Sequence, residues 1–89
     1  MPLISMFYGI IIYLYYLDNK KHHIAHIHAE FAEFEGIFNI ETGEMIEGDL
    51  PSPKRVMVQA WMEIHRDELM ADWKLAVNGE QPFKIDPLR

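Results

Sequence analysis

The chain of 89 residues contains no cysteine, few basic residues and no long hydrophobic segment. Without cysteine, it can form neither disulfide bonds nor metal sites built on thiolates. Eight lysine and arginine residues stand against 14 aspartate and glutamate residues, so the formal net charge is -6 at pH 7. Nucleic-acid affinity rests largely on lysine and arginine displacing counterions from phosphates, so nucleic-acid binding is not expected.

The longest apolar run spans residues 7–17, which is too short to cross a bilayer. No basic segment precedes this run and no small-residue cleavage site follows it, so it lacks the pattern of a secretory signal. We therefore expect a cytoplasmic protein with no membrane segment. Hydrophobic residues make up 49% of the chain, which is typical of a folded protein, and the length suits one domain over residues 1–89.

The first half of the chain has patterns typical of an antiparallel sheet. β-Branched and aromatic residues are frequent there, in several short runs. Turn signals separate these runs, among them Asp18-Asn19 and a loop around Gly43, whose freedom to adopt a positive φ suits a tight turn. Short connections between consecutive strands predict a meander of three or four strands. The strands are expected at about residues 7–17, 22–31, 33–40 and 45–47.

The second half of the chain changes to a helical period after Ser52-Pro53, a pair typical of a helix start. Apolar residues recur there at four-residue steps, and Asn78-Gly79 supplies a stop. One helix and two helices with a break near His65 both fit this pattern. The sequence thus predicts an α+β fold with a helix or a helical pair on one face of the sheet. The helical region is expected at about residues 53–77 and an extended tail at residues 82–89.

Four of the five histidines lie close together, in residues 22–28. In an extended strand, successive side chains point to opposite faces, so the even-numbered residues share one face and the odd-numbered residues share the other. The odd face is apolar and is expected to lie under the helices. The even face carries His22, His26, His28 and Glu30, and the odd face carries Ala25, Ile27, Ala29 and Phe31.

The histidine face allows two kinds of chemistry. Imidazole is a common ligand of divalent transition metals, so such a metal could be a cofactor. Without a metal, a histidine pair could act as general base and acid in a hydrolytic, nuclease-like reaction. A third interpretation gives these residues no chemistry and places them on a solvated or partner-covered sheet face. The metal candidates are His22, His26, His28 and Glu30, and the catalytic candidates are His26 and His28.

The arrangement of layers also suggests an interaction function. With helices on only one face, the other face of the sheet would be exposed and aromatic enough to contact a partner protein or a second copy of the chain. Aromatic residues of the helical region lie on its apolar stripe and are expected to be structural. Among them, His65 would be a neutral core histidine bonded to the backbone, away from the strand histidines. The contact surface would comprise Tyr13, Tyr15, His26 and His28, and the structural set Trp61, His65 and Trp73.

Several motifs spread along the chain occur together in one known family. They are Asp18-Asn19-Lys20-Lys21-His22-His23, His26-Ile27-His28-Ala29, Ile40-Glu41-Thr42-Gly43-Glu44, Leu50-Pro51, and Trp61 to Leu69 with Trp73. In these motifs the chain resembles the bacterial domain-of-unknown-function family 4160. The resemblance implies a small protein of unestablished activity that acts with a second small protein encoded nearby, in an arrangement like a toxin-antitoxin pair. We therefore predict an interaction protein first, and a histidine-dependent metal-binding or hydrolytic domain as the alternative.

Overall fold

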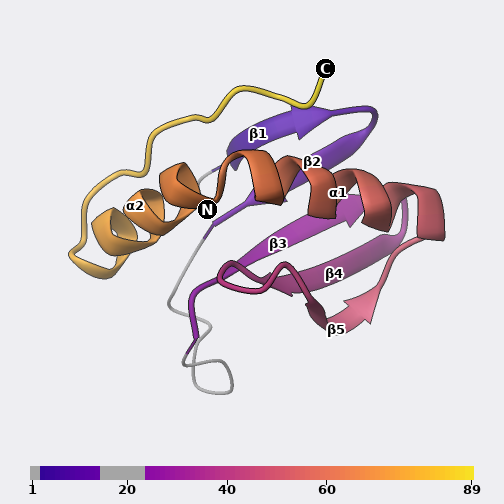
Figure 1. The fold of residues 1–89 in the computed structure, drawn as a ribbon, viewed down its shortest axis with the longest axis horizontal. Coiled ribbons are helices and arrows are strands. Elements are labelled where there is room, and N and C mark those ends of the chain that lie inside the picture. Colours follow the sequence, from indigo (N-terminus) through magenta and orange to yellow (C-terminus); the bar gives the residue numbers. More distant parts are fainter. Residues whose placement is uncertain (1–2, 15–23) are drawn as a thin grey trace.

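The computed structural model describes residues 3–14 and 24–89. Five antiparallel strands form one sheet in chain order, and two helices pack against it (Figure 1), which confirms the predicted α+β meander. None of the helices formed by these residues is long and apolar enough to cross a membrane. The elements are β1 (Leu3–Phe7), β2 (Ile10–Tyr13), β3 (His26–Phe31), β4 (Phe34–Asn39), β5 (Met45–Asp49), α1 (Ser52–Ile64) and α2 (Arg66–Val77).

The sheet has five strands rather than three or four, because residues 3–7 form a strand ahead of the one expected at residues 7–17, which begins only at Ile10. Tyr8 and Gly9 both have a positive φ, 50° and 79°, as a two-residue type I′ hairpin turn requires. This turn folds β1 back along β2, with Phe7 opposite Ile10. The expected strand over residues 22–31 also differs, since β3 begins at His26. Residues 15–17 and 22–23 of the expected strands lie outside the described residues.

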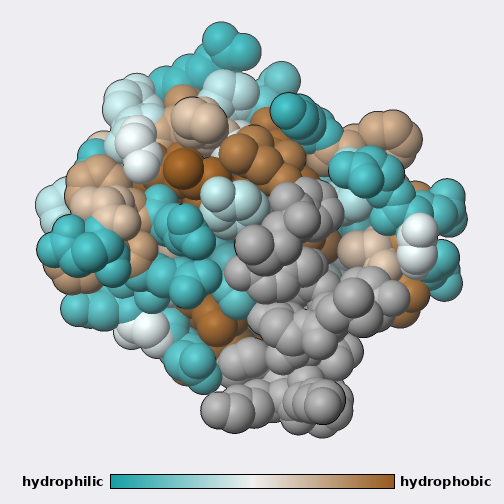
Figure 2. Space-filling model, turned by 180° about the vertical axis from the view of Figure 1, so that it is seen from behind, coloured by the Kyte–Doolittle hydropathy of each residue, from teal (hydrophilic) through white to brown (hydrophobic). Residues whose placement is uncertain are grey.

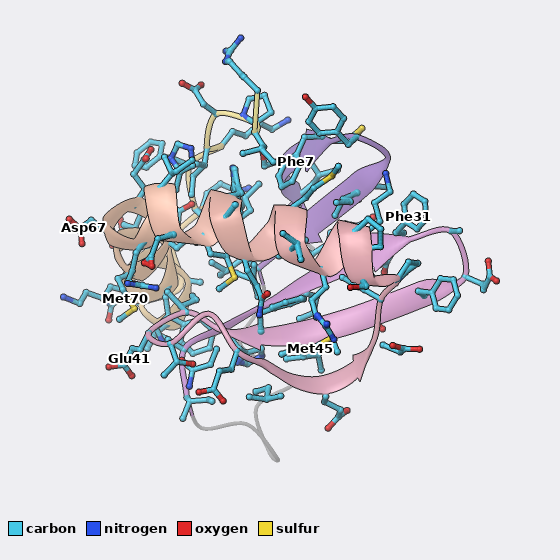
Figure 3. The ribbon with its side chains drawn as sticks, turned by 45° about the vertical axis from the view of Figure 1, so that its right-hand side comes forward. Phe7, Phe31, Glu41, Met45, Asp67 and Met70 are labelled. Atoms are coloured by element: carbon cyan, nitrogen blue, oxygen red, sulfur yellow. The ribbon has the colours of Figure 1, made fainter. Side chains whose placement is uncertain are left out.

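The core lies between the sheet and α1. Phe7, Phe31 and Met45 lie on the side of the sheet that α1 covers (Figure 3). The odd-numbered face of β3 belongs to this core, so the alternation along that strand sets which side chains meet the helix. Each large side chain that is fully buried contributes about 1.5–3 kcal/mol. The core residues of β3, β4 and α1 are Ile27, Ala29, Phe38, Val58, Trp61 and Met62. His26, His28 and Ile37 are buried on the other face of the sheet.

The helical region is divided at His65, so the structure has two helices rather than one. His65 has φ -112° and ψ 22°, which ends α1 and precedes α2. Asp67 and Glu68 occupy the first turn of α2, where negative charge is favourable. Arg66 Nε donates a hydrogen bond to the carbonyl of Ile40 at 3.3 Å, which ties the junction to the chain just after β4. As a result, α2 lies past the end of the sheet at which β3 begins (Figure 1).

A tail without regular secondary structure, residues 80–89, runs from the end of α2 back to β1 (Figure 1). Among the described residues, three hydrogen bonds attach residues 83–86 of the tail to the body of the protein. The Phe83 amide donates to Asp72 Oδ1 at 2.9 Å, and the Ile85 amide donates to the Ile4 carbonyl at 2.8 Å. The indole Nε1 of Trp61 donates to the carbonyl of Asp86 at 2.8 Å. The tail therefore joins α1, α2 and β1.

Candidate functional site

His26 and His28 lie on the same face of β3, with their ring centroids 5.4 Å apart. The strand is paired on both sides, with β2 and with β4, so this pair is fixed near the middle of the sheet. Across the strands, His28 lies opposite Tyr13 of β2 and Ile37 of β4. Both histidines are buried, with exposed fractions of 0% and 5%.

The hydrogen bonds of the two rings define their proton positions. Nδ1 of His26 lies 2.8 Å from the carbonyl of Ile24, and Nδ1 of His28 lies 3.1 Å from Oε2 of Glu35. A carbonyl or carboxylate oxygen only accepts, so Nδ1 carries the proton in both rings. In a neutral ring the other nitrogen, Nε2, then carries a lone pair in place of a proton. We call His26, His28 and Glu35 the histidine site.

Orientation of an imidazole through its Nδ1 proton is the arrangement found in metal-ligating and general-base histidines. In this site a backbone carbonyl orients one ring and a carboxylate orients the other. Glu35 lies directly opposite Glu30 and Asp49 on the neighbouring strands, and the hydrogen bond from His28 partly offsets the repulsion within that row. The two hydrogen bonds therefore fix the tautomer and the orientation of both rings.

Glu35 is a member of the site that the sequence prediction missed. It lies seven residues after His28, on a different strand, and the antiparallel register of β3 and β4 brings the two together. The alternation along residues 34–39, which places Glu35 and Ile37 on one face, was the available signal. The partner of His28 depended on the register, which alternation alone does not specify.

The other predicted metal ligands are not brought into the histidine site by the described residues. Glu30 is half-buried and lies beside Glu35 and Ile11 in the register, and His22 lies outside the described part of the chain. Within residues 3–14 and 24–89, no group of three or more histidine, aspartate or glutamate side chains is placed to hold a metal ion. The full four-ligand set therefore stays a prediction.

The predicted aromatic contact surface has a different character from the one expected. Its two histidines are buried, Tyr13 is half-buried, and Tyr15 lies outside the described residues. The side of the molecule away from α1 carries many hydrophilic residues over the described surface, with hydrophobic residues between them (Figure 2). Contact of a partner with this face stays a prediction, but His26 and His28 do not offer it an exposed surface.

Trp73 of α2 packs against the histidine site. Its indole lies 5.0 Å from the ring of His26, at an interplanar angle of 55°. The sequence placed Trp73 with the core, on the other side of β3 from the histidines. Because α2 lies past the end of the sheet, this indole reaches His26 while it also packs against the core cluster. The position of Trp73 thus depends on the direction of α2 after the break at His65.

His65 does not join the strand histidines. Its ring lies 5.6 Å from the indole of Trp61, and its Nδ1 lies 2.5 Å from Oε1 of Glu68. The hydrogen-bond partner is therefore a carboxylate one helical turn on, rather than the backbone acceptor that we expected. Trp61 itself is fully buried, in accord with a structural role.

Asp72 is a buried carboxyl group that the sequence prediction did not single out. It is 3% exposed and lies on the inward side of α2, between Leu69 and Ala76 in the helical period. Its Oδ1 accepts the Phe83 amide, whereas Oδ2 has no hydrogen-bond partner in the described part of the chain. Burial raises the pKa of Asp72, the hydrogen bond from Phe83 opposes this, and the nearby charge of Glu68 adds to the rise.

Helix α1 has a second apolar side that faces solvent. Val56 is 57% exposed and Ile64 is 67% exposed, and Ala60 lies exposed between them. Residues four apart lie on one side of a helix, so these three form a continuous row, which we call the α1 outer stripe. The opposite side of α1 is held in the core by Val58 and Trp61. The outer stripe is therefore presented on a fixed support.

Comparison with known proteins gives one match. A family model described as a domain of unknown function, DUF4160, matches residues 9–74. That range runs from the β1–β2 turn to α2 and includes the histidine site and the α1 outer stripe. No curated protein and no solved structure matches the chain.

Proposed function

The chain belongs to the DUF4160 family of domains of unknown function, and from this premise we propose that it is an interaction protein that acts with a separately encoded partner. The observation that carries the proposal is the α1 outer stripe. Single exposed apolar residues are common on protein surfaces, but a continuous row on one helix face is typical of a contact site. Anchors at four-residue steps suit a groove on a partner protein. The partner would be a second small protein encoded nearby, as in a toxin-antitoxin pair.

Charged residues near the stripe would set the orientation in which α1 binds the partner. Lys54 and Arg55 lie at the start of α1, and Glu63 lies at its end. The stripe thus has a basic end, whereas the Glu63 carboxylate at its other end is paired with Arg66 at 2.9 Å. A partner groove with acidic residues at the end that meets Lys54 and Arg55 would bind it in one orientation, because charge complementarity mainly sets orientation and association rate.

The proposal also includes the location of the protein and the class of its partner. We place the protein in the cytoplasm, and we take its partner to be a protein rather than a nucleic acid, because the net charge of -6 disfavours contact with phosphates. A second copy of the chain could occupy the same stripe. Measurement of the mass in solution, alone and with the partner, distinguishes a homodimer from the proposed complex.

The test uses variants of the outer stripe, because these leave the core side of α1 unchanged. The chain is co-expressed with the protein encoded beside it, and the complex is measured by size-exclusion chromatography with light scattering. The double variant Val56→Glu/Ile64→Glu should lose the complex while its circular dichroism and thermal unfolding stay close to those of the unaltered chain. Ala71→Glu/Val77→Glu adds the same charge at exposed positions of α2 and should keep the complex. Failure of the unaltered chain to form a complex contradicts the proposal.

A second candidate function rests on the histidine site. The Nδ1 hydrogen bonds of His26 and His28 orient their rings as in metal-binding and proton-transferring histidines. The alternative proposal is a domain that binds a divalent transition metal or catalyses a hydrolytic, nuclease-like reaction with these residues. Elemental analysis of the purified, untagged chain beside His26→Ala/His28→Ala tests the metal form. Near-stoichiometric metal that is lost in a folded variant supports it, whereas an unaltered chain without metal contradicts it.

A further inference from the structure

A groove of about 390 Å³ lies between β1 and the tail. One wall is formed by residues 3–6 of β1 and the other by residues 84–87 of the tail. Four successive strand residues extend over roughly 13 Å, at about 3.3 Å each, so this wall is the length of a short peptide strand. The groove lies at the β1 edge of the sheet, two strands away from β3 and the histidine site.

β1 is an edge strand without charged side chains of its own. Within the described residues, β2 is the only strand paired with it. Its sequence, Leu-Ile-Ser-Met-Phe, contains no charge, whereas the opposite edge strand β5 carries Glu47 and Asp49. Charged side chains are a common defence of sheet edges against pairing with other chains. The tail covers the edge of β1 instead.

The tail makes little use of the hydrogen-bonding groups along this edge. In the described structure, one backbone hydrogen bond joins it to β1, from the Ile85 amide to the Ile4 carbonyl. A regular strand of four residues would exchange more, because alternate residues of an edge strand present both an amide and a carbonyl. The contact with Ile85 nevertheless establishes that this edge accepts a backbone donor from a neighbouring segment.

Ser5 gives a second and independent indication of a ligand. It lines the groove and is only 5% exposed, yet its Oγ has no hydrogen-bond partner within residues 3–14 and 24–89. A register shift between Leu3 and Ser5 lies at this point of the β1–β2 pairing, so that Ile4 and Ser5 are buried in succession. Such bulges often redirect a side chain next to a functional site. A buried hydroxyl without a partner is unfavourable unless a ligand supplies one.

We propose that the outer edge of β1 is a docking site for an extended peptide segment of the partner protein, which adds to the sheet as a sixth strand and displaces residues 83–87. A backbone strand fits the edge because it supplies amides and carbonyls at the spacing of β1. A serine, threonine or asparagine on the incoming segment would pair with Ser5 Oγ. The inference rests on the proposed function for the existence of a partner chain, but it names a different surface from the outer stripe.

Hydrogen exchange measured by mass spectrometry or NMR tests this inference on the complete chain with the protein encoded beside it. On complex formation, amides of β1 should exchange more slowly, and the amides of Phe83 and Ile85 should exchange at least about tenfold faster because their hydrogen bonds open. A complex that leaves residues 3–7 and 83–87 unchanged overturns the inference while the proposed function stands.

Affinity of the same complex gives a side-chain test. Ser5→Ala should weaken the complex about tenfold without loss of thermal stability, because it removes a hydroxyl that has no partner in the free chain. Ser52→Ala is the matched control at an exposed position where the side chain makes no capping hydrogen bond, and it should leave the affinity unchanged. Equal affinities of the two variants contradict the assignment of Ser5.

A further arm does not depend on the partner. A labelled peptide with the sequence of residues 81–89 is added to the complete chain carrying Ile85→Pro, which removes the amide that bonds to Ile4. Fluorescence anisotropy should show binding to this variant and at least about tenfold weaker binding to the unaltered chain, whose own tail occupies the edge. Phe83→Pro, which removes the amide bonded to Asp72, serves if Ile85→Pro does not fold. A folded variant that does not bind the peptide overturns the inference, whether or not a complex forms.

Discussion

Replacement of Asp72 by asparagine should stabilise the protein at neutral pH. The carboxyl group is 3% exposed, and its Oδ2 has no hydrogen-bond partner among the residues that the structure describes. Asparagine has nearly the same shape, and its Oδ1 can still accept the Phe83 amide, so the tail contact is kept. The variant removes the cost of a buried negative charge but leaves one buried polar group unpaired. We therefore expect a gain of about 1 kcal/mol, less than the full cost of a buried unpaired group.

The dependence on pH gives the sign of the effect. Burial raises the pKa of Asp72 in the folded chain above its ordinary value of 3.8, so the folded state binds this proton more tightly than the unfolded state. The contribution of Asp72 to stability is then fully present below the unfolded pKa and is lost as the pH rises through the folded pKa. The advantage of Asp72→Asn should accordingly be largest at pH 7 and should disappear toward pH 4.

Urea unfolding followed by circular dichroism measures this difference at pH 7 and at pH 4. A gain of 1 kcal/mol corresponds to about 4–8 °C in melting temperature for a domain of this size. Other carboxyl groups titrate equally in both chains and cancel in the difference. A variant that is less stable at pH 7 would refute the reasoning, because it would mean that the charge of Asp72 stabilises the fold. Asp72→Ala, which also removes the acceptor for Phe83, is the matched control and should lower stability.

Three further predictions concern other parts of the structure. Ser5→Ala should keep or raise the free energy of unfolding by up to about 1 kcal/mol in urea, since the lost hydroxyl is buried without a described partner; a clear loss would show that it is paired. Gly48→Ala should lower the free energy of unfolding by more than about 2 kcal/mol, because Gly48 has φ +86° and an added Cβ would lie 2.1 Å from the Glu35 carbonyl oxygen. Gly79→Ala is the control: Gly79 has φ +79° but open space around it, so this variant should lose only about 1 kcal/mol. Equal losses of stability in the two variants would contradict the steric argument. Tyr8→Asn should raise the melting temperature, because asparagine tolerates the φ of 50° better than tyrosine does; an unchanged or lower value would contradict strain at this turn.

The class of fold could be predicted from the sequence because its signals are local. Two patterns carry these signals, the alternation along residues 26–31 and 34–39 and the four-residue period after Ser52. Each depends on a few neighbouring residues, and each corresponds to strands or helices of the structure. The turn at Tyr8-Gly9 was missed because apolar residues continue through it. Hydropathy does not record a positive φ, and Gly9 alone was too weak a signal to divide the run.

The candidate site was predicted less completely because its geometry depends on long-range packing. His26 and His28 share a face of β3, as the period of two requires. The contact of Glu35 with the His28 ring depends on the register of β3 and β4. The contact of Trp73 with the His26 ring depends on the direction of α2. The burial of the two rings depends on both. The α1 outer stripe was missed for a different reason: one broad apolar pattern was assigned to the core as a whole, although the helix has apolar residues on two sides.

The central claim is that this chain is one half of a two-protein complex formed through the α1 outer stripe. Sedimentation equilibrium of the purified chain mixed with the protein encoded beside it tests this most directly, because it gives both the mass and the affinity of any complex. We predict a complex with the unaltered chain, and at least about hundredfold weaker association, close to 2.7 kcal/mol, for Val56→Glu/Ile64→Glu. Sedimentation of the two unaltered proteins as separate species would contradict the account.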